Sequence, residues 1–276
     1  MRPESLCAAA TRCIRFDGVD LVDLLTQISD PSFLKVHNSL LDKELRSCIA
    51  LGTVTSIRAG AFDGTAWLNN QSDGLVYVGK IAYVYKGTMP ANTSIILRDG
   101  SKEIADRAFF NCTNLTSITI PNSVTTIGSH AFSGCTSLTS ITIPDSVTTI
   151  HTSAFFGCTS LTSVTISNSV TSIEPQTFQE CTSLTSITIP DSVISIGGSV
   201  FIHCSSLTNV TIPNSITTIG SFAFQDCTSL TNITIPNSIT SIEAGIFQGC
   251  TGLTSITIRY SVTVFSCLSF SMLYYS

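Results

Sequence analysis

A strict 23-residue period constrains this chain of 276 residues more than any other feature. Seven cysteines recur at that spacing, and a leucine follows each of them three residues later. The cysteines are Cys112, Cys135, Cys158, Cys181, Cys204, Cys227 and Cys250, and the leucines are Leu115, Leu138, Leu161, Leu184, Leu207, Leu230 and Leu253. One such unit cannot bury its own apolar face, but stacked units share a continuous core. The period therefore predicts a solenoid.

Within each unit, apolar and polar residues follow one order. In the first regular unit, Ser117, Ile118 and Thr119 alternate, which predicts a strand whose isoleucine points inward. Val124 and Ile127 predict a second, shorter strand, after which a compact helical or 3₁₀ turn returns the chain. The period and the Leu-x-x-Ile-x-Ile core lie in the range of leucine-rich repeats. The predicted fold class is a leucine-rich repeat solenoid: β-rich α/β, with parallel strands stacked and joined by short helical or 3₁₀ returns.

The residue before each cysteine belongs to a short list of types. Gly or Asp stands there in most units, which is consistent with a left-handed backbone conformation. The positions are Gly134, Gly157, Glu180, His203, Asp226 and Gly249.

The repeat also divides the chain. The predicted parts are an N-terminal variable segment at 1–50, read as a helical cap, degenerate repeats at 51–111, regular repeats at 112–265, and a tail or truncated repeat at 266–276. An insertion at 66–90 interrupts the degenerate repeats. Within it, Leu75–Val78 and Ile81–Tyr85 flank Gly79-Lys80, which predicts a β-hairpin.

Charge excludes several kinds of partner. Charged residues make up 11% of the chain, well below the roughly 25% of an average globular protein. Residues 108–258 contain neither Lys nor Arg. Nucleic acids are bound by neutralising phosphates with such cations, so no nucleic-acid partner is expected for the repeats. No apolar run approaches the roughly 18 residues that cross a bilayer, so no direct membrane insertion is expected either.

The seven periodic cysteines could suggest disulfides or metal. Structural metal sites use ligands that converge on one point, whereas these cysteines run in a row along the stack. Parallel inward side chains also face each other poorly for a disulfide. Because free cysteine is among the most buried residue types, we expect these thiols to pack in the core.

Histidines invite a catalytic interpretation that the repeat does not support. His130, His151 and His203 occupy three different positions of the unit, so they do not stack into one site. His151 takes a position that Gly or Glu fills in other units and is expected to face solvent. Without a nucleophile and an orienting acid beside it, no triad is predicted. We predict no enzyme, no catalytic residue, no metal site and no cofactor.

The motif LTSITIPNSVTTIGSHAFSGC and its copies resemble the BspA-like leucine-rich repeat family, found in bacterial surface proteins and some parasitic protists. The resemblance covers about 51–265. It implies attachment, because members are mostly surface or secreted adhesins that contact host matrix proteins or other cells, and it implies no catalytic residues. A surface or secreted location follows from the resemblance, although no secretory signal peptide is visible in the first twenty residues.

The outward strand positions form the candidate binding face. They are Ser117, Thr119, Ser140, Thr142, Ser163, Thr165, Ser186, Thr188, Asn209, Thr211, Asn232, Thr234, Ser255 and Thr257. Solenoids commonly bind through such extended faces, so a non-enzymatic module that binds a protein or a glycan is predicted. The alternatives are that these residues serve only solubility and strand formation, that the chain is a structural spacer in a larger surface protein, and that the regular threonines contact ice.

Overall fold

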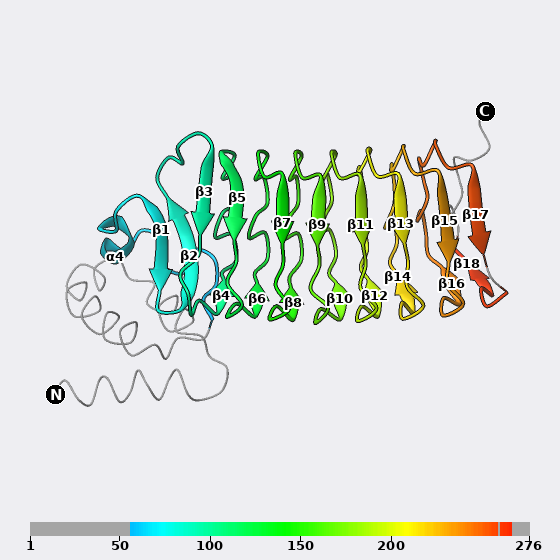
Figure 1. Ribbon diagram of the computed structural model, residues 1–276, viewed down its shortest axis with the longest axis horizontal. Coiled ribbons are helices and arrows are strands. Elements are labelled where there is room, and N and C mark those ends of the chain that lie inside the picture. The colour runs from blue at the N-terminus through cyan, green and yellow to red at the C-terminus, as the bar shows by residue number, and fades with distance from the viewer. Residues whose placement is uncertain (1–55, 259, 267–276) are drawn as a thin grey trace.

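The computed structural model describes residues 56–258 and 260–266, which form a parallel β-solenoid of about eight turns (Figure 1). This confirms the leucine-rich repeat solenoid. The helices predicted in 1–50 lie outside the described residues, as does the tail beyond Ser266.

Each turn of the solenoid supplies one strand to each of two series. The first series comprises β3 (Thr93–Ile96), β5 (Leu115–Thr119), β7 (Ser140–Thr142), β9 (Ser163–Thr165), β11 (Ser186–Thr188), β13 (Asn209–Thr211), β15 (Asn232–Ile235) and β17 (Ser255–Ile258). The second comprises the two-residue strands β4 (Glu103–Ile104), β6 (Thr126–Ile127), β8 (Thr149–Ile150), β10 (Ser172–Ile173), β12 (Ser195–Ile196), β14 (Thr218–Ile219), β16 (Ser241–Ile242) and β18 (Val264–Phe265). The longer strands run side by side along the stack (Figure 1).

Successive strands pair in parallel, in a register of one repeat. Thr142 of β7 pairs with Thr165 of β9, which pairs with Thr188 of β11. In the first series, the hydrogen-bonded sheets are β3-β5, β7-β9-β11-β13 and β15-β17. In the second, they are β1-β2-β4-β6-β8, β10-β12-β14 and β16-β18. Equivalent residues of neighbouring coils therefore stand in columns about 4.8 Å apart.

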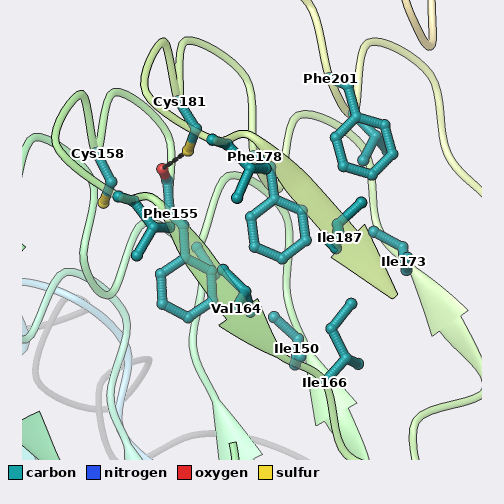
Figure 2. Packing of buried hydrophobic residues seen from close by; sticks show 14 of the residues in the cluster. Ile150, Phe155, Cys158, Val164, Ile166, Ile173, Phe178, Cys181, Ile187 and Phe201 are labelled. Carbon is teal, nitrogen blue, oxygen red and sulfur yellow. Dashed lines mark hydrogen bonds between the residues drawn. The ribbon is translucent and has the colours of Figure 1, made fainter. Parts of the chain in front are cut away.

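A single apolar core fills the space inside the coils. Seven phenylalanines at one position of the repeat are almost fully buried and stack along it: Phe109, Phe132, Phe155, Phe178, Phe201, Phe224 and Phe247. The rings of Phe155 and Phe178 are 5.5 Å apart at 6° (Figure 2). Isoleucines and valines of both strand series pack against this column. Each coil therefore buries its apolar residues against the coils before and after it.

The seven periodic cysteines lie in this core as free, buried thiols. From the second to the seventh, each thiol donates a hydrogen bond to the carbonyl oxygen of the phenylalanine 26 residues earlier. Figure 2 shows one of these bonds, from Cys181 to Phe155 at 3.3 Å. The expectation of core packing is confirmed.

The returns between coils are hydrogen-bonded turns, and the one helix among the described residues is α4 (Ala66–Asn69). The prediction that the returns are short helices or 3₁₀ turns was therefore wrong, although the predicted solenoid is present. Successive backbone groups bond alternately within the coil and to the next coil. The Ala131 N–H donates to Gly128 in the same coil, whereas the Phe132 N–H donates to Ala154 in the next. A continuous helix would use every N–H internally, so bonding between coils replaces it.

Two residues of each return have the left-handed backbone conformation. The first is the residue before the cysteine, as predicted. Its φ is 74° at Gly134 and 60° at His203. A second such position lies four residues earlier, and its residues are Arg107, His130, Ser153, Gln176, Ser199, Phe222 and Gly245. Arg, Ser, Gln and Phe, which fill most of these positions, give no sequence signal for a positive φ, and the second position was not predicted.

A hairpin occupies the N-terminal end of the second series. β1 (Gly74–Val78) and β2 (Ile81–Lys86) pair as antiparallel strands, in the two segments expected to form a hairpin. β2 then pairs in parallel with β4, so the hairpin continues the stack. Behind it, Phe62, Trp67 and Tyr83 form a separate small core with T-shaped and tilted ring contacts.

A turn links the two strands of each coil. The N–H of Val147 donates to the Pro144 carbonyl at 2.9 Å, and most coils repeat this bond. The serine before the valine or isoleucine reaches back to the previous coil: Ser146 donates to Val124 at 2.6 Å and Ser192 to Val170 at 2.7 Å. These hydroxyls tie neighbouring turns together.

Candidate functional site

The fourteen predicted face residues all lie in the first strand series, and all are exposed. They form two columns because parallel pairing places equivalent residues side by side. Ser140 stands beside Ser163, and Ser186 stands beside Asn209. Between the two columns, Ile141, Val164 and the equivalent residues of β11 to β15 point into the core. The alternation predicted from sequence is therefore present along the stack.

Hydroxyl groups on this face are mostly free to bind a partner. Ser117 shares a 2.7 Å hydrogen bond with Ser94 at the N-terminal end. Within the described residues, the hydroxyls of Ser140, Ser163 and Thr165 make no hydrogen bond to another protein group. Each free hydroxyl can donate one hydrogen bond and accept others. The face therefore offers donors and acceptors at a spacing that the coil repeat fixes.

A third column of threonines stands beside these two and was missed in the sequence. Its members are Thr116, Thr139, Thr162, Thr185, Thr208, Thr231 and Thr254, all exposed except Thr116. The Leu-x-x-Ile spacing puts two residues rather than one between inward side chains, so both of them face outward. Several of these hydroxyls donate to the backbone of the preceding coil, as Thr162 does to Thr139 at 3.0 Å. This column therefore supports the stack rather than offering free donors.

A shallow groove of about 620 Å³ crosses the face over β5, β7 and β9. It brings together five of the predicted residues: Ser117, Thr119, Ser140, Thr142 and Thr165. Its far edge is a row of exposed turn residues, Asn122, Asp145 and Asn168, which were not among the predicted face residues. The Asn168 N–H donates to the Asp145 carboxylate at 3.1 Å, so the row is ordered. Amide and carboxylate groups thus join the hydroxyls in one groove.

The remaining sequence candidates lie elsewhere and do not form a catalytic cluster. His151 is exposed, as expected, and His203 lies 3.4 Å from the Asp226 carboxylate on the return side. In the part of the chain that the structure describes, no three histidine, cysteine or acidic side chains converge as a metal site would require. Burial raises the pKa of the Cys158 thiol to about 12, so the thiolate that binds metal or attacks substrates is scarce.

None of the helices within 56–258 and 260–266 is both long and apolar enough to cross a membrane.

Comparison with known proteins places the chain in a family. Residues 80–205 and 171–274 match the BspA type leucine-rich repeat region, which has six copies, and together they cover more than half of the chain. No curated protein matches the sequence.

Solved structures of bacterial leucine-rich repeat proteins are similar to this chain. One from Eubacterium ventriosum is 30% identical with a TM-score of 0.58, and the match covers 68% of this chain and 48% of that one. The T. pallidum leucine-rich repeat protein is 30% identical with a TM-score of 0.47, over 70% of this chain and 82% of that one. One from Bacteroides ovatus is 25% identical with a TM-score of 0.49, over 77% and 66%.

The chain spans about half the length of the Eubacterium ventriosum protein. The family match agrees with the 23-residue repeat period and with the stacked coils of the structure. The chain belongs to the BspA-type leucine-rich repeat family and is a repeat protein of the kind that serves protein interaction.

Proposed function

We propose that this chain is a non-enzymatic binding module of adhesin type, placed on a cell surface or secreted, that contacts protein or glycan partners through its Ser/Thr-lined strand face. The observation that carries the proposal is the fixed array of exposed and mostly unpaired hydroxyls in the first strand series. Family membership supports it, because leucine-rich repeats present extended faces to their partners.

The chemistry of the face favours many weak contacts over one strong one. It has no lysine or arginine from β5 to β17, and its side chains are hydroxyls and amides. Tight interfaces depend on aromatic and arginine anchors, which the face lacks. Affinity would then grow with the number of coils engaged and would depend little on salt, because few charges take part.

The test replaces two face threonines with lysine. Thr165 and Thr188 pair across β9 and β11, and both side chains are exposed. Binding of the full chain to immobilised matrix proteins and glycans is measured at two salt concentrations. We expect saturable, salt-insensitive binding that the Thr165→Lys, Thr188→Lys variant reduces about tenfold or more, because two long cations block the hydroxyl array.

The matched control places two lysines on another side of the same coils. Thr148 and Thr171 are also exposed and one repeat apart, but they precede β8 and β10 of the second series. The Thr148→Lys, Thr171→Lys variant adds the same charge and should bind like the parent. Equal binding by the face variant and the parent would refute the proposal.

A structural spacer is the second candidate. The observation that favours it is the unbroken column of stacked phenylalanines, which joins all the regular coils into one rod. A rod of this kind holds other domains apart without needing a partner on its strand face. Absence of saturable binding across the whole panel would favour the spacer over the binding module.

A further inference from the structure

A second groove lies on the return side of four successive coils, from the coil that carries Arg107 to the coil that carries Glu180, away from the strand face. It has a volume of about 600 Å³, and its lining includes Arg107, Phe110, His130, Phe156, Gln176 and Glu180. We name it the return groove. None of the fourteen strand-face residues lines it. It therefore needs its own explanation.

Side chains vary here in a way that they do not on the strand face. At the second left-handed position, successive coils carry Arg107, His130, Ser153 and Gln176. Three residues further on, they carry Phe110, Ser133, Phe156 and Gln179. The strand columns, by contrast, repeat serine and threonine from coil to coil. A surface that presents different groups at fixed spacing can distinguish one ligand from another, which a uniform surface does poorly.

The N-terminal end of the groove has the composition of an interface anchor. Phe110 leaves 43% of its surface exposed. The Arg107 guanidinium lies 5.4 Å above its ring. Within the described residues, Arg107 makes no ion pair. An arginine stacked on an aromatic ring is a preferred binding partner for a carboxylate, and this one has its charge available.

The other end of the groove carries the opposite charge. Glu180 belongs to the fourth coil, three coils along the stack from Arg107. At about 4.8 Å per coil, that is roughly 14 Å. An extended peptide rises about 3.4 Å per residue, so about four residues span the two charges. Phe110 lies beside Arg107 at the first end, and Phe156 lies two coils further along, between the two charges. Both rings offer apolar surface to a peptide laid along the groove.

We propose that the return groove binds an extended peptide segment of a partner protein, with an acidic residue over Arg107, apolar residues beside Phe110 and Phe156, and a basic residue about four positions later over Glu180. Opposite charges at a fixed separation fit a polypeptide better than a glycan, because a peptide carries both signs in defined order. This site is separate from the strand face and does not depend on it.

The test selects random heptapeptides, displayed on phage, against the full chain. We expect enrichment of sequences with Asp or Glu four positions before Lys or Arg and apolar residues between them. A selected peptide is then synthesised with a fluorescent label, and its affinity is measured by anisotropy. Arg107→Gln and Phe110→Ser should each weaken binding about tenfold or more, because each removes an anchor.

Both substitutions have precedents in the chain itself. Gln176 fills the position of Arg107 with nearly the same φ, 60° against 58°, and Ser133 fills the position of Phe110 in the next coil. The variants are therefore expected to fold. The matched control is Arg98→Gln, because Arg98 stacks on Tyr77 at 4.2 Å outside the groove. It should bind the peptide like the parent, as should the Thr165→Lys, Thr188→Lys variant.

Three results would overturn the proposal. The first is a selection that enriches no such charge pattern. The second is a selected peptide that binds Arg107→Gln as tightly as it binds the parent. The third is binding to a glycan array that is lost in Arg107→Gln, which would assign the groove to a sugar instead.

Discussion

At the scale of single residues, one position of the repeat joins the coils through a column of aromatic rings. Its phenylalanines stack with ring centroids 5.2 to 5.9 Å apart and interplanar angles of 14° or less. A ring in this column contacts the coil before and the coil after it. Loss of one ring therefore weakens two interfaces between coils as well as the core of its own coil.

Phe178→Ala should test this role. Phe178 is fully buried between Phe155 and Phe201, and large-to-small changes at such sites cost about 3–5 kcal/mol. We expect the free energy of unfolding in urea to fall by about that amount. Phe110→Ser, at an exposed position, should change it by less than about 1 kcal/mol. Similar losses in the two variants would contradict a special role for the stacked column.

At the scale of elements, the hairpin closes the N-terminal end of the second strand series. β2 pairs with β4, and the Tyr83 ring of β2 packs against Phe62 in the small core. The Tyr83 hydroxyl also accepts a 3.0 Å hydrogen bond from the backbone N–H of Phe62. This bond holds the segment before α4 against the hairpin. Burial raises the pKa of Tyr83, so its hydroxyl stays protonated at neutral pH.

Tyr83→Phe should loosen this end of the molecule first. The change leaves the buried N–H of Phe62 without its acceptor, which costs about 1–3 kcal/mol. Trp67 is the one tryptophan in the sequence and lies in this small core. Its fluorescence should therefore change at a lower urea concentration in the variant than in the parent.

Tyr77→Phe is the matched control for that change. The Tyr77 hydroxyl also accepts from a backbone N–H 21 residues away, that of Arg98, but at an exposed site where water can replace it. We expect its fluorescence transition to coincide with that of the parent. A shift as large as that of Tyr83→Phe would mean that burial of the hydrogen bond is not what matters.

At the scale of the whole molecule, the buried thiols link stability to pH. Burial raises the pKa of Cys158, Cys204 and Cys250 to about 12, from an ordinary value of 9.0. The folded chain therefore keeps protons that the unfolded chain releases above about pH 9. Stability from this source is complete below pH 9 and is lost as pH rises toward 12.

The urea midpoint of the full chain should therefore fall steadily between pH 9 and pH 11. Replacing Cys158 and Cys204 with alanine should make that fall smaller, because two of the shifted groups are gone. If the urea midpoint fell with pH as steeply in the variant as in the parent, groups other than these thiols would control the pH dependence of stability. Iodoacetamide labelling at pH 8, resolved by mass spectrometry, gives a second reading: the seven periodic thiols should react only after unfolding.

The regular part of this fold is readable from sequence because its contacts repeat. A residue and its neighbour in the next coil are 23 positions apart, so each inward position is seen several times in one sequence. The buried Cys158, the outward Ser163 and Thr165, and the left-handed Gly157 all follow from that repetition. The strand face was predicted residue by residue for the same reason, whereas its use in binding stays a prediction.

Tertiary structure decided the features that do not repeat or that depend on backbone geometry. The turn conformation of the returns came from hydrogen bonds between coils, which compete with helical bonds and leave no local signal. The positive φ at Arg107 and Phe222 goes with that bonding rather than with residue type. The return groove exists because stacking brings Arg107, Phe110 and Glu180 onto one surface. The sequence by itself determined the columns of equivalent residues, because they repeat every 23 positions. The packing of one coil on the next determined which unlike side chains of different coils lie together on one surface.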